Sequence, residues 1–107
     1  MSDFTIVRND RLPSIACVFG GGSGRTLAAG TTVKFIMALK STGVVKVSAA
    51  AVIEDATARR VRYDWTALNT DTAGDYVAEF EVTYTDGLVE TFPQGRKLSV
   101  KVLADLG

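Results

Sequence analysis

The sequence of 107 residues contains no histidine and only one cysteine, Cys17. Without histidine, neither a Ser-His-Asp nor a Cys-His nucleophilic centre can be assembled. A single cysteine excludes an internal disulfide, and a transition-metal site would lack most of its usual ligands. We therefore predict that the protein is not an enzyme and that it has no catalytic, cofactor-binding or metal site.

The chain also lacks an excess of charge of either sign. Its 12 Lys and Arg residues balance 12 Asp and Glu residues, which gives a formal net charge of zero and a pI of about 6.2. A protein dedicated to nucleic acids needs a basic face, so we expect no nucleic-acid partner. A neutral chain has little charge to keep its copies apart, which favours a protein that belongs to an assembly.

Long apolar runs are missing as well. No stretch approaches the roughly 20 residues that cross a membrane. Residues 1–10 lack the basic and apolar regions of a signal peptide. We expect no membrane partner, and we expect the chain to be made and folded in a cytoplasm.

The clearest pattern that is present is a strand at residues 76–84. Apolar and polar residues alternate there with a period of two, which predicts one buried face and one exposed face. Asp86-Gly87 separates this strand from a second extended run at residues 88–92, and such a dipeptide between strands is a strong hairpin signal. The apolar set on the first strand is Tyr76, Ala78, Phe80, Val82 and Tyr84.

Six further extended runs accompany this hairpin. The run at residues 44–53 is the least regular, because Ala49–Ala51 suits one helical turn as well as a strand. Seven or eight short strands at this spacing are typical of a β-sandwich. We predict an all-β fold, with residues 1–107 forming a single immunoglobulin-like antiparallel β-sandwich domain without a disulfide. The six runs lie at residues 4–7, 14–19, 31–39, 44–53, 60–65 and 97–103.

The segment before the central strand, Asp71–Tyr76, resembles the lead into strand F of immunoglobulin-like domains. In those domains a tyrosine side chain bonds back to upstream backbone and forms the tyrosine corner. We interpret Cys17 as an inert, inward strand residue, because no histidine is present to activate it. The predicted structural core contains Cys17, Phe35, Tyr63, Trp65, Tyr76, Phe80 and Val82.

The glycine-rich run Gly20–Gly24 suggests a phosphate-binding loop. A dinucleotide fingerprint needs a helix after the loop, and the residues from Arg25 to Gly30 are too few and too glycine-bounded to form one. We interpret the run as a mobile loop between strands, or as a loop that becomes ordered on a neighbouring subunit.

Two acidic side chains, Glu79 and Glu81, share the outward face of the central strand. We expect them to be solvated or to pair across strands with Arg60 or Arg62. Catalysis by carboxylates would instead need two acids that face each other in a closed pocket, and this alternative stays open at the level of sequence.

The orientation of Phe92 depends on the hairpin register. A two-residue Asp86-Gly87 turn pairs Tyr84 with Val89 and places Phe92 on the outward face, where an apolar patch would mark an interface. A three-residue loop that ends at Gly87 instead pairs Phe92 with Phe80 and turns it inward. The sequence is compatible with both registers.

The order of these motifs resembles the immunoglobulin-like N-terminal domain of phage baseplate upper proteins, and small virion proteins similar to it. The match covers nearly the whole chain. The residues that carry it are Asp10, Leu12-Pro13-Ser14-Ile15, Gly30-Thr31-Thr32-Val33-Lys34-Phe35, Met37, Val61-Arg62-Tyr63-Asp64-Trp65, Asp71-Thr72, Gly74-Asp75-Tyr76, Ala78-Glu79-Phe80, Val82, Asp86-Gly87 and Thr91-Phe92-Pro93.

This resemblance implies a non-enzymatic structural component of a tailed-bacteriophage virion, in the tail or baseplate. The alternatives are a capsid decoration or head–tail junction protein, or a module that binds a host surface or carbohydrate. The implied partners are other virion proteins and further copies of the chain in a homo-oligomer or symmetric assembly. The candidate interface contains Gly21, Gly22, Ser23, Arg25, Glu79, Glu81 and Phe92.

Overall fold

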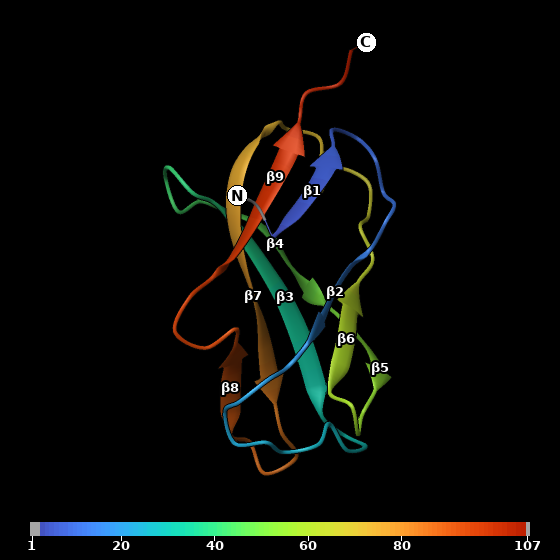
Figure 1. Cartoon of the computed structure of the whole chain (residues 1–107), viewed down its shortest axis with the longest axis vertical. Helices are drawn as coiled ribbons and strands as arrows, with labels where there is room; N and C mark the ends of the chain where they lie inside the picture. The colour runs from blue at the N-terminus through green and yellow to red at the C-terminus, as the bar shows by residue number, and fades with distance from the viewer. Residues whose placement is uncertain (1–2, 107) are drawn as a thin grey trace.

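The computed structural model describes residues 3–106 and arranges nine strands in two facing sheets (Figure 1). Over these residues, no helix has the length and apolar character needed to cross a membrane. The strands are β1 (Phe4–Val7), β2 (Ile15–Val18), β3 (Thr32–Leu39), β4 (Val45–Ala50), β5 (Val52–Asp55), β6 (Arg60–Tyr63), β7 (Gly74–Thr83), β8 (Val89–Phe92) and β9 (Leu98–Leu103).

The larger sheet has the strand order β1-β9-β7-β3-β4, and β8 also pairs with β7. The smaller sheet has the order β2-β6-β5 and faces the first (Figure 1). All neighbouring strands are antiparallel except β1 and β9, which run parallel. The predicted all-β, immunoglobulin-like sandwich is therefore confirmed.

The irregular run at residues 44–53 explains why the structure has nine strands rather than the seven or eight predicted. The chain is extended throughout this run, but it changes sheet at Ala51, so that β4 pairs with β3 and β5 pairs with β6. The Ala51 N–H donates to the Val33 carbonyl at 2.8 Å and ties the crossing point to the larger sheet. Ala49 and Ala50 belong to β4 and Ala51 links β4 to β5, so the alanine cluster forms no helical turn.

The core between the sheets is built around Phe35, which is fully buried. Its ring stacks on Tyr63 of the opposite sheet, with 4.7 Å between ring centroids, and meets the edge of Trp65 at 5.6 Å. Phe80 lies beside it on the neighbouring strand at 5.1 Å. Six of the seven predicted core side chains are buried; the seventh, Cys17, is half-buried and packs against the core.

The tyrosine corner is present. Tyr76 lies at the beginning of β7, and its Oη donates a hydrogen bond to the Thr72 carbonyl at 2.7 Å. Its ring is buried, so the bond satisfies a phenol oxygen that would otherwise be costly to remove from water. This contact fixes the loop before β7 against the sheet.

The hairpin between β7 and β8 takes the three-residue register. Phe80 pairs with Phe92, and the Tyr84 N–H donates to the Leu88 carbonyl at 2.9 Å across a loop that ends at Gly87. Gly87 has a φ of 87°, which favours glycine at this position. Phe92 is 1% exposed and stacks on Phe19 at 4.4 Å. Our placement of Phe92 in an interface is therefore wrong, because the ring belongs to the core.

Candidate functional site

On the edge of β7 that faces away from β3, two separate strands pair with β7 instead of one continuous strand. The break between them shapes the surface. β9 pairs with residues 74–78 of β7, and β8 pairs with residues 80–83. Residues 93–97, which we name the 93–97 loop, connect the two and bulge out opposite Glu79. A hollow lies on each side of this loop.

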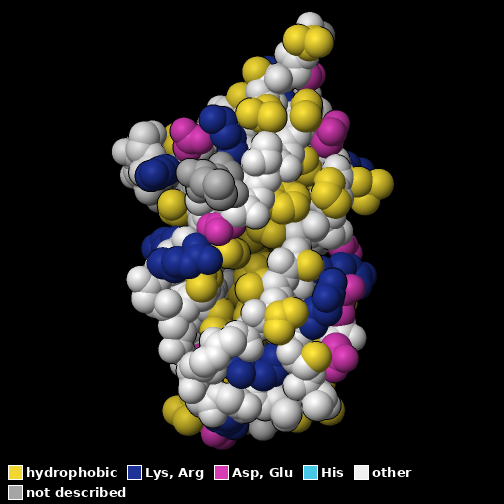
Figure 2. All heavy atoms as spheres, viewed as in Figure 1, with side chains coloured by type: hydrophobic (Ala, Val, Ile, Leu, Met, Phe, Trp, Pro, Cys, Tyr) yellow, Lys and Arg dark blue, Asp and Glu magenta, His cyan; other side chains and the backbone are white. Residues whose placement is uncertain are grey.

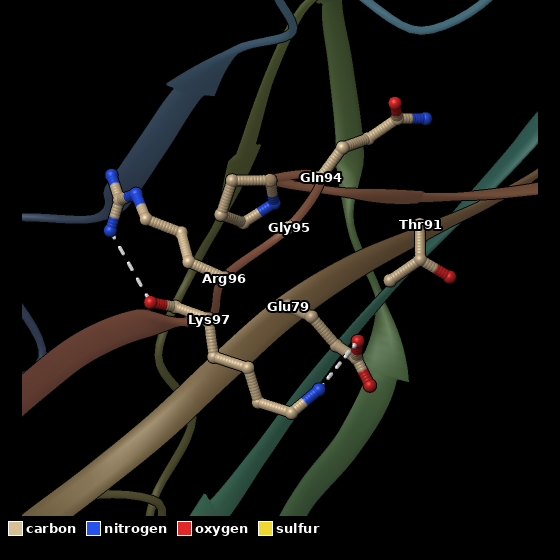
Figure 3. Close-up of a pocket in the computed structure, with 7 residues that line it drawn as sticks. Glu79, Thr91, Gln94, Gly95, Arg96 and Lys97 are labelled. Carbon is tan, nitrogen blue, oxygen red and sulfur yellow. Dashed lines mark hydrogen bonds and ion pairs between the residues drawn. The ribbon is translucent and has the colours of Figure 1, made fainter.

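The first hollow lies over the outer face of the larger sheet and has a cavity volume of about 490 Å³ (Figure 3). Lys97 reaches across it to the Glu79 carboxylate, with 3.2 Å between Nζ and Oε2. Arg96 turns the other way and donates to the Lys97 carbonyl at 3.3 Å (Figure 3). It also donates to the Asp3 carboxylate at 2.9 Å. Because both cations already have partners at an exposed surface, this hollow holds two weak ion pairs rather than an unfilled charged site.

The second hollow, with a cavity volume of about 370 Å³, lies between the 93–97 loop and β2. Residues 17–22 line one wall, and residues 92–94 line the other. Figure 2 shows a hollow near the middle of the face that is turned to the viewer, with apolar side chains at its floor. The second hollow is thus a gap between the two sheets at the side where β2 ends the smaller sheet.

Strand β2 has an unpaired edge beside this hollow. Within residues 3–106, β2 pairs with β6 and with no other strand. The Phe19 N–H donates to the Arg59 carbonyl at 2.9 Å, and hydrogen-bonded pairs alternate along an antiparallel ladder. The main-chain N–H and C=O groups of Ala16 and Val18 therefore point away from β6, toward the open side.

The free edge of β2 carries no charge. Residues 12–24 contain neither an acidic nor a basic side chain, and Val18 is 58% exposed. Three of the other edge strands contain a charge: Lys46 in β4, Glu54 in β5 and Glu90 in β8. The edge strand β1 contains none, but Asp3 precedes it and Arg8 follows it directly. Natural sheets protect free edges with charges, because an unguarded edge is a template for pairing.

The glycine-rich loop after β2 is held by Glu90. Ser23 donates to this carboxylate from its backbone N–H at 2.8 Å and from its Oγ at 2.7 Å, and the Tyr84 hydroxyl donates at 2.6 Å. The bonds from Tyr84 and Ser23 lower the pKa of Glu90 from 4.5 to about 2. Arg25 lies over the Tyr84 ring at 4.1 Å. These contacts anchor the loop within its own chain.

The remaining predicted interface residues do not form one cluster. Gly21 and Gly22 line the second hollow, and Glu79 lines the first. Glu81 faces Lys34 across the ladder with β3. The expected pairing of Glu79 or Glu81 with arginines of β6 is wrong, because Arg60 and Arg62 lie in the other sheet and bind Glu54 at 3.1 and 3.3 Å.

The sequence analysis did not identify the β2 edge or the 93–97 loop. The uncharged run at residues 12–24 was a usable signal for the edge. The loop had no comparable signal, because the break in the strand appears only when β8 and β9 are both placed against β7.

The site offers little chemistry beyond binding. Burial raises the pKa of the Cys17 thiol, so the thiol stays protonated and weakly reactive. Among residues 3–106, no three His, Cys, Asp or Glu side chains gather closely enough to hold a metal ion. What the arrangement does provide is an open strand edge, with free main-chain donors and acceptors, beside a hollow with an apolar floor. The Arg59 guanidinium borders this hollow, 5.5 Å from the Phe92 ring and bound to the Gly21 carbonyl at 3.0 Å.

Neither a comparison with protein-family models nor one with curated protein sequences finds a match. Among solved structures, the fold is similar to that of CopC from Methylosinus trichosporium OB3b, with a TM-score of 0.56 and 21% sequence identity. The match covers 100% of this chain and 89% of CopC. At this identity the likeness shows the fold.

The structural match also corrects our functional expectation. The matched protein belongs to Methylosinus trichosporium OB3b and not to a phage particle, so the expected role as a structural component of a virion is wrong. The expected location in a virion is wrong for the same reason. The resemblance of the sequence motifs to a phage domain family stays a prediction.

Proposed function

We propose that this protein is a non-enzymatic binding module that takes up an extended segment of a partner protein as an additional strand on β2. The observation that carries this proposal is the free edge of β2, which is uncharged over residues 12–24 and adjoins the second hollow. Strand addition of this kind obtains its affinity from main-chain hydrogen bonds and its specificity from pockets beside the edge.

The two walls of the second hollow suit an incoming strand. Ala16 and Val18 present main-chain groups that an added strand satisfies, and Phe19 and Phe92 form an apolar floor below them. A side chain of the added strand that points inward would enter the hollow. Burial of an aliphatic side chain there contributes about 1.5–3 kcal/mol, which makes a medium-sized apolar residue the preferred occupant.

A metal-handling function, which the name of the matched protein suggests, finds no support in the residues of this chain. CopC is a copper-binding protein. Copper sites in proteins use imidazole, thiolate and thioether ligands. This chain has no histidine. Among residues 3–106, the thiolate and thioether candidates are the half-buried Cys17 and Met37, which is 0% exposed in the core. The described residues therefore do not fit a copper site.

The experiment that tests strand addition is the selection of binders from a library of eight-residue peptides, followed by amide hydrogen exchange on the complex. We expect bound peptides to slow exchange at the amides of Ala16 and Val18. We also expect Ala16→Pro to abolish binding while the fold is retained, because this substitution removes an N–H that points away from β6.

Ala16→Ser is the matched control, since it changes the side chain but keeps the N–H, and it should bind the same peptides. Protection at β4 or β8 in place of β2 would contradict the proposal. So would equal binding by the Pro and Ser variants, because main-chain pairing at Ala16 would then be unnecessary.

A further inference from the structure

We infer that the strand added to β2 is β2 of a second copy of this chain, so that two copies form an antiparallel pair about a two-fold axis that passes beside Cys17. This inference rests on the function proposed above and names its partner. A two-fold arrangement joins the same patch on both copies, so the patch must complement itself. The β2 edge does so in its register, its shape and its charge.

The register follows from the main-chain groups that are free. Ala16 and Val18 point away from β6, so Ala16 of one copy pairs with Val18 of the second, and the reverse pair forms by symmetry. On the outward face, this places the larger Val side chain beside the smaller Ala side chain in both pairs. Cys17 then faces Cys17 of the second copy in a non-hydrogen-bonded pair.

The flanking residues complement each other in the same register. Pro13 approaches Gly20 and Gly21 of the second copy, where a Cβ on either glycine would meet nothing within 4 Å. Leu12 is 77% exposed and lies just beyond the paired residues, near the turn that begins at Gly21 of the second copy and borders the second hollow. An exposed apolar side chain of each copy thus comes close to the border of the other copy's hollow.

The charges around the edge also agree with self-association. Over residues 12–24 neither copy carries a charge that would be buried without a partner. The zero net charge of the chain adds no long-range repulsion between two copies.

The four residues of β2 are too few to hold two copies together by themselves. A specific dimer buries about 600 Å² or more on each copy, which is roughly a tenth of the 6069 Å² that one copy exposes. The contacts of Leu12 and of the glycine run are therefore required in addition to the strand pairing. We expect a dimer that forms and dissociates with concentration.

Sedimentation velocity over a range of protein concentrations tests the inference. We expect the wild-type chain to shift from monomer to dimer as concentration rises, with slower exchange at the Ala16 and Val18 amides in the dimer. Val18→Lys should raise the dissociation constant by about tenfold or more, because it places a charge on the pairing edge.

Val45→Lys is the matched control. Val45 lies on the β4 edge and is 56% exposed, close to the 58% of Val18, so the two variants add the same charge to equally exposed strand positions. The β4 variant should dimerise like the wild type. Equal weakening by both variants would overturn the inference, because it would show a general effect of charge.

Cys17 reports the register. Directly opposite Cα atoms in a non-hydrogen-bonded pair are about 4.5 Å apart, within the range that a disulfide spans. With oxidised glutathione as oxidant, two Cys17 thiols form one intermolecular disulfide and each glutathione disulfide is reduced to two thiols. We expect a covalent dimer from the wild type and much less from Val18→Lys. Because burial raises the pKa of this thiol, the reaction is run at alkaline pH with excess oxidant, and a dimer that stays non-covalent under those conditions would overturn the register centred on Cys17.

The two proposals fail in different ways. A chain that stays monomeric at every concentration, yet shows protected Ala16 and Val18 amides when a library peptide binds, overturns the second-copy inference and leaves strand addition standing. A chain that stays monomeric and binds no peptide at β2 overturns both.

Discussion

The two long sides of the sandwich, where the edges of the two sheets meet, are closed in different ways. On one side the chain itself passes from β4 to β5 at Ala51 and joins the larger sheet to the smaller one. Charged residues guard this side, with Lys46 bound to Asp71 and Glu54 bound to Arg60. On the other side, β2 faces β8 and the 93–97 loop across the second hollow, and no strand among residues 3–106 closes the gap.

The two sides also differ in the charged residues that their edge strands carry. An edge that must stay solitary carries charges that would be costly to bury against another strand. The edge of β2 has none between Leu12 and Gly24, although the other two strands of its sheet, β6 and β5, each contain two. This absence of charge is the reason why we propose the β2 edge as the surface for an added strand.

The largest expected effect comes from a residue in the core between the two sides. Phe35→Ala removes a fully buried ring that contacts both sheets, and we expect it to lower the free energy of unfolding by about 3–5 kcal/mol. Urea unfolding followed by the fluorescence of buried Trp65 measures the change. Val18→Ala, on the exposed edge, should alter it by less than about 0.5 kcal/mol. Similar losses in both variants would remove the distinction between core and open edge.

Glu90 stabilises the open side in a pH-dependent manner. Its pKa is about 2 in the folded chain, against 4.5 ordinarily, so the unfolded chain binds the proton more readily. The stabilisation is complete above about pH 4.5 and is lost as pH falls toward 2. We expect Glu90→Gln to cost about 1–2 kcal/mol at pH 7 and to flatten the acid limb of stability against pH. An unchanged acid limb would show that Glu90 does not hold the loop.

The tyrosine corner lies outside the open side and allows a cleaner test of one hydrogen bond. Tyr76→Phe removes the donor to the Thr72 carbonyl but keeps the buried ring, and we expect a loss of about 1 kcal/mol in urea unfolding. Thr72→Ala should cost much less, because the acceptor is a backbone carbonyl that the substitution retains. A larger loss from Thr72→Ala would assign the stabilisation to the threonine side chain.

The smallest expected effect concerns the ion pair on the closed side. Lys46 binds Asp71, and their side chains are 26% and 34% exposed. We expect Lys46→Gln to lower the free energy of unfolding by less than about 1 kcal/mol, and the difference should shrink in 1 M salt (approximately 3 Å screening length). A large loss that disappears in salt would mean that this side is closed by electrostatics and not by the continuity of the chain at Ala51.

The local sequence pattern was enough to predict most of the strands and the tyrosine corner. The period-two alternation at residues 76–84 has one physical interpretation, a strand with one buried face, and the structure places β7 there. Asp86-Gly87 predicted a hairpin but not its register, because two- and three-residue loops both suit this dipeptide. Packing of Phe92 against Phe19 and Phe80 favours the register that buries the ring.

The sequence pattern could not predict which residues, far apart in the chain, contact each other in the structure. Arg60 and Arg62 have the right charge for Glu79, but the sheet to which each strand belongs depends on where the chain crosses at Ala51. The anchoring of the glycine-rich run by Glu90 depends in the same way on β8 lying beside the loop.

The sequence by itself determined the class of the fold, the buried faces of its strands and the absence of charge along residues 12–24, because these follow from the order of polar and apolar residues. Only the tertiary structure decided that β2 ends its sheet, that β8 and β9 leave a gap opposite Glu79, and that a hollow lies between them. The physical reason is that pairing and enclosure join residues far apart in the chain, and their energies depend on the whole arrangement of the two sheets.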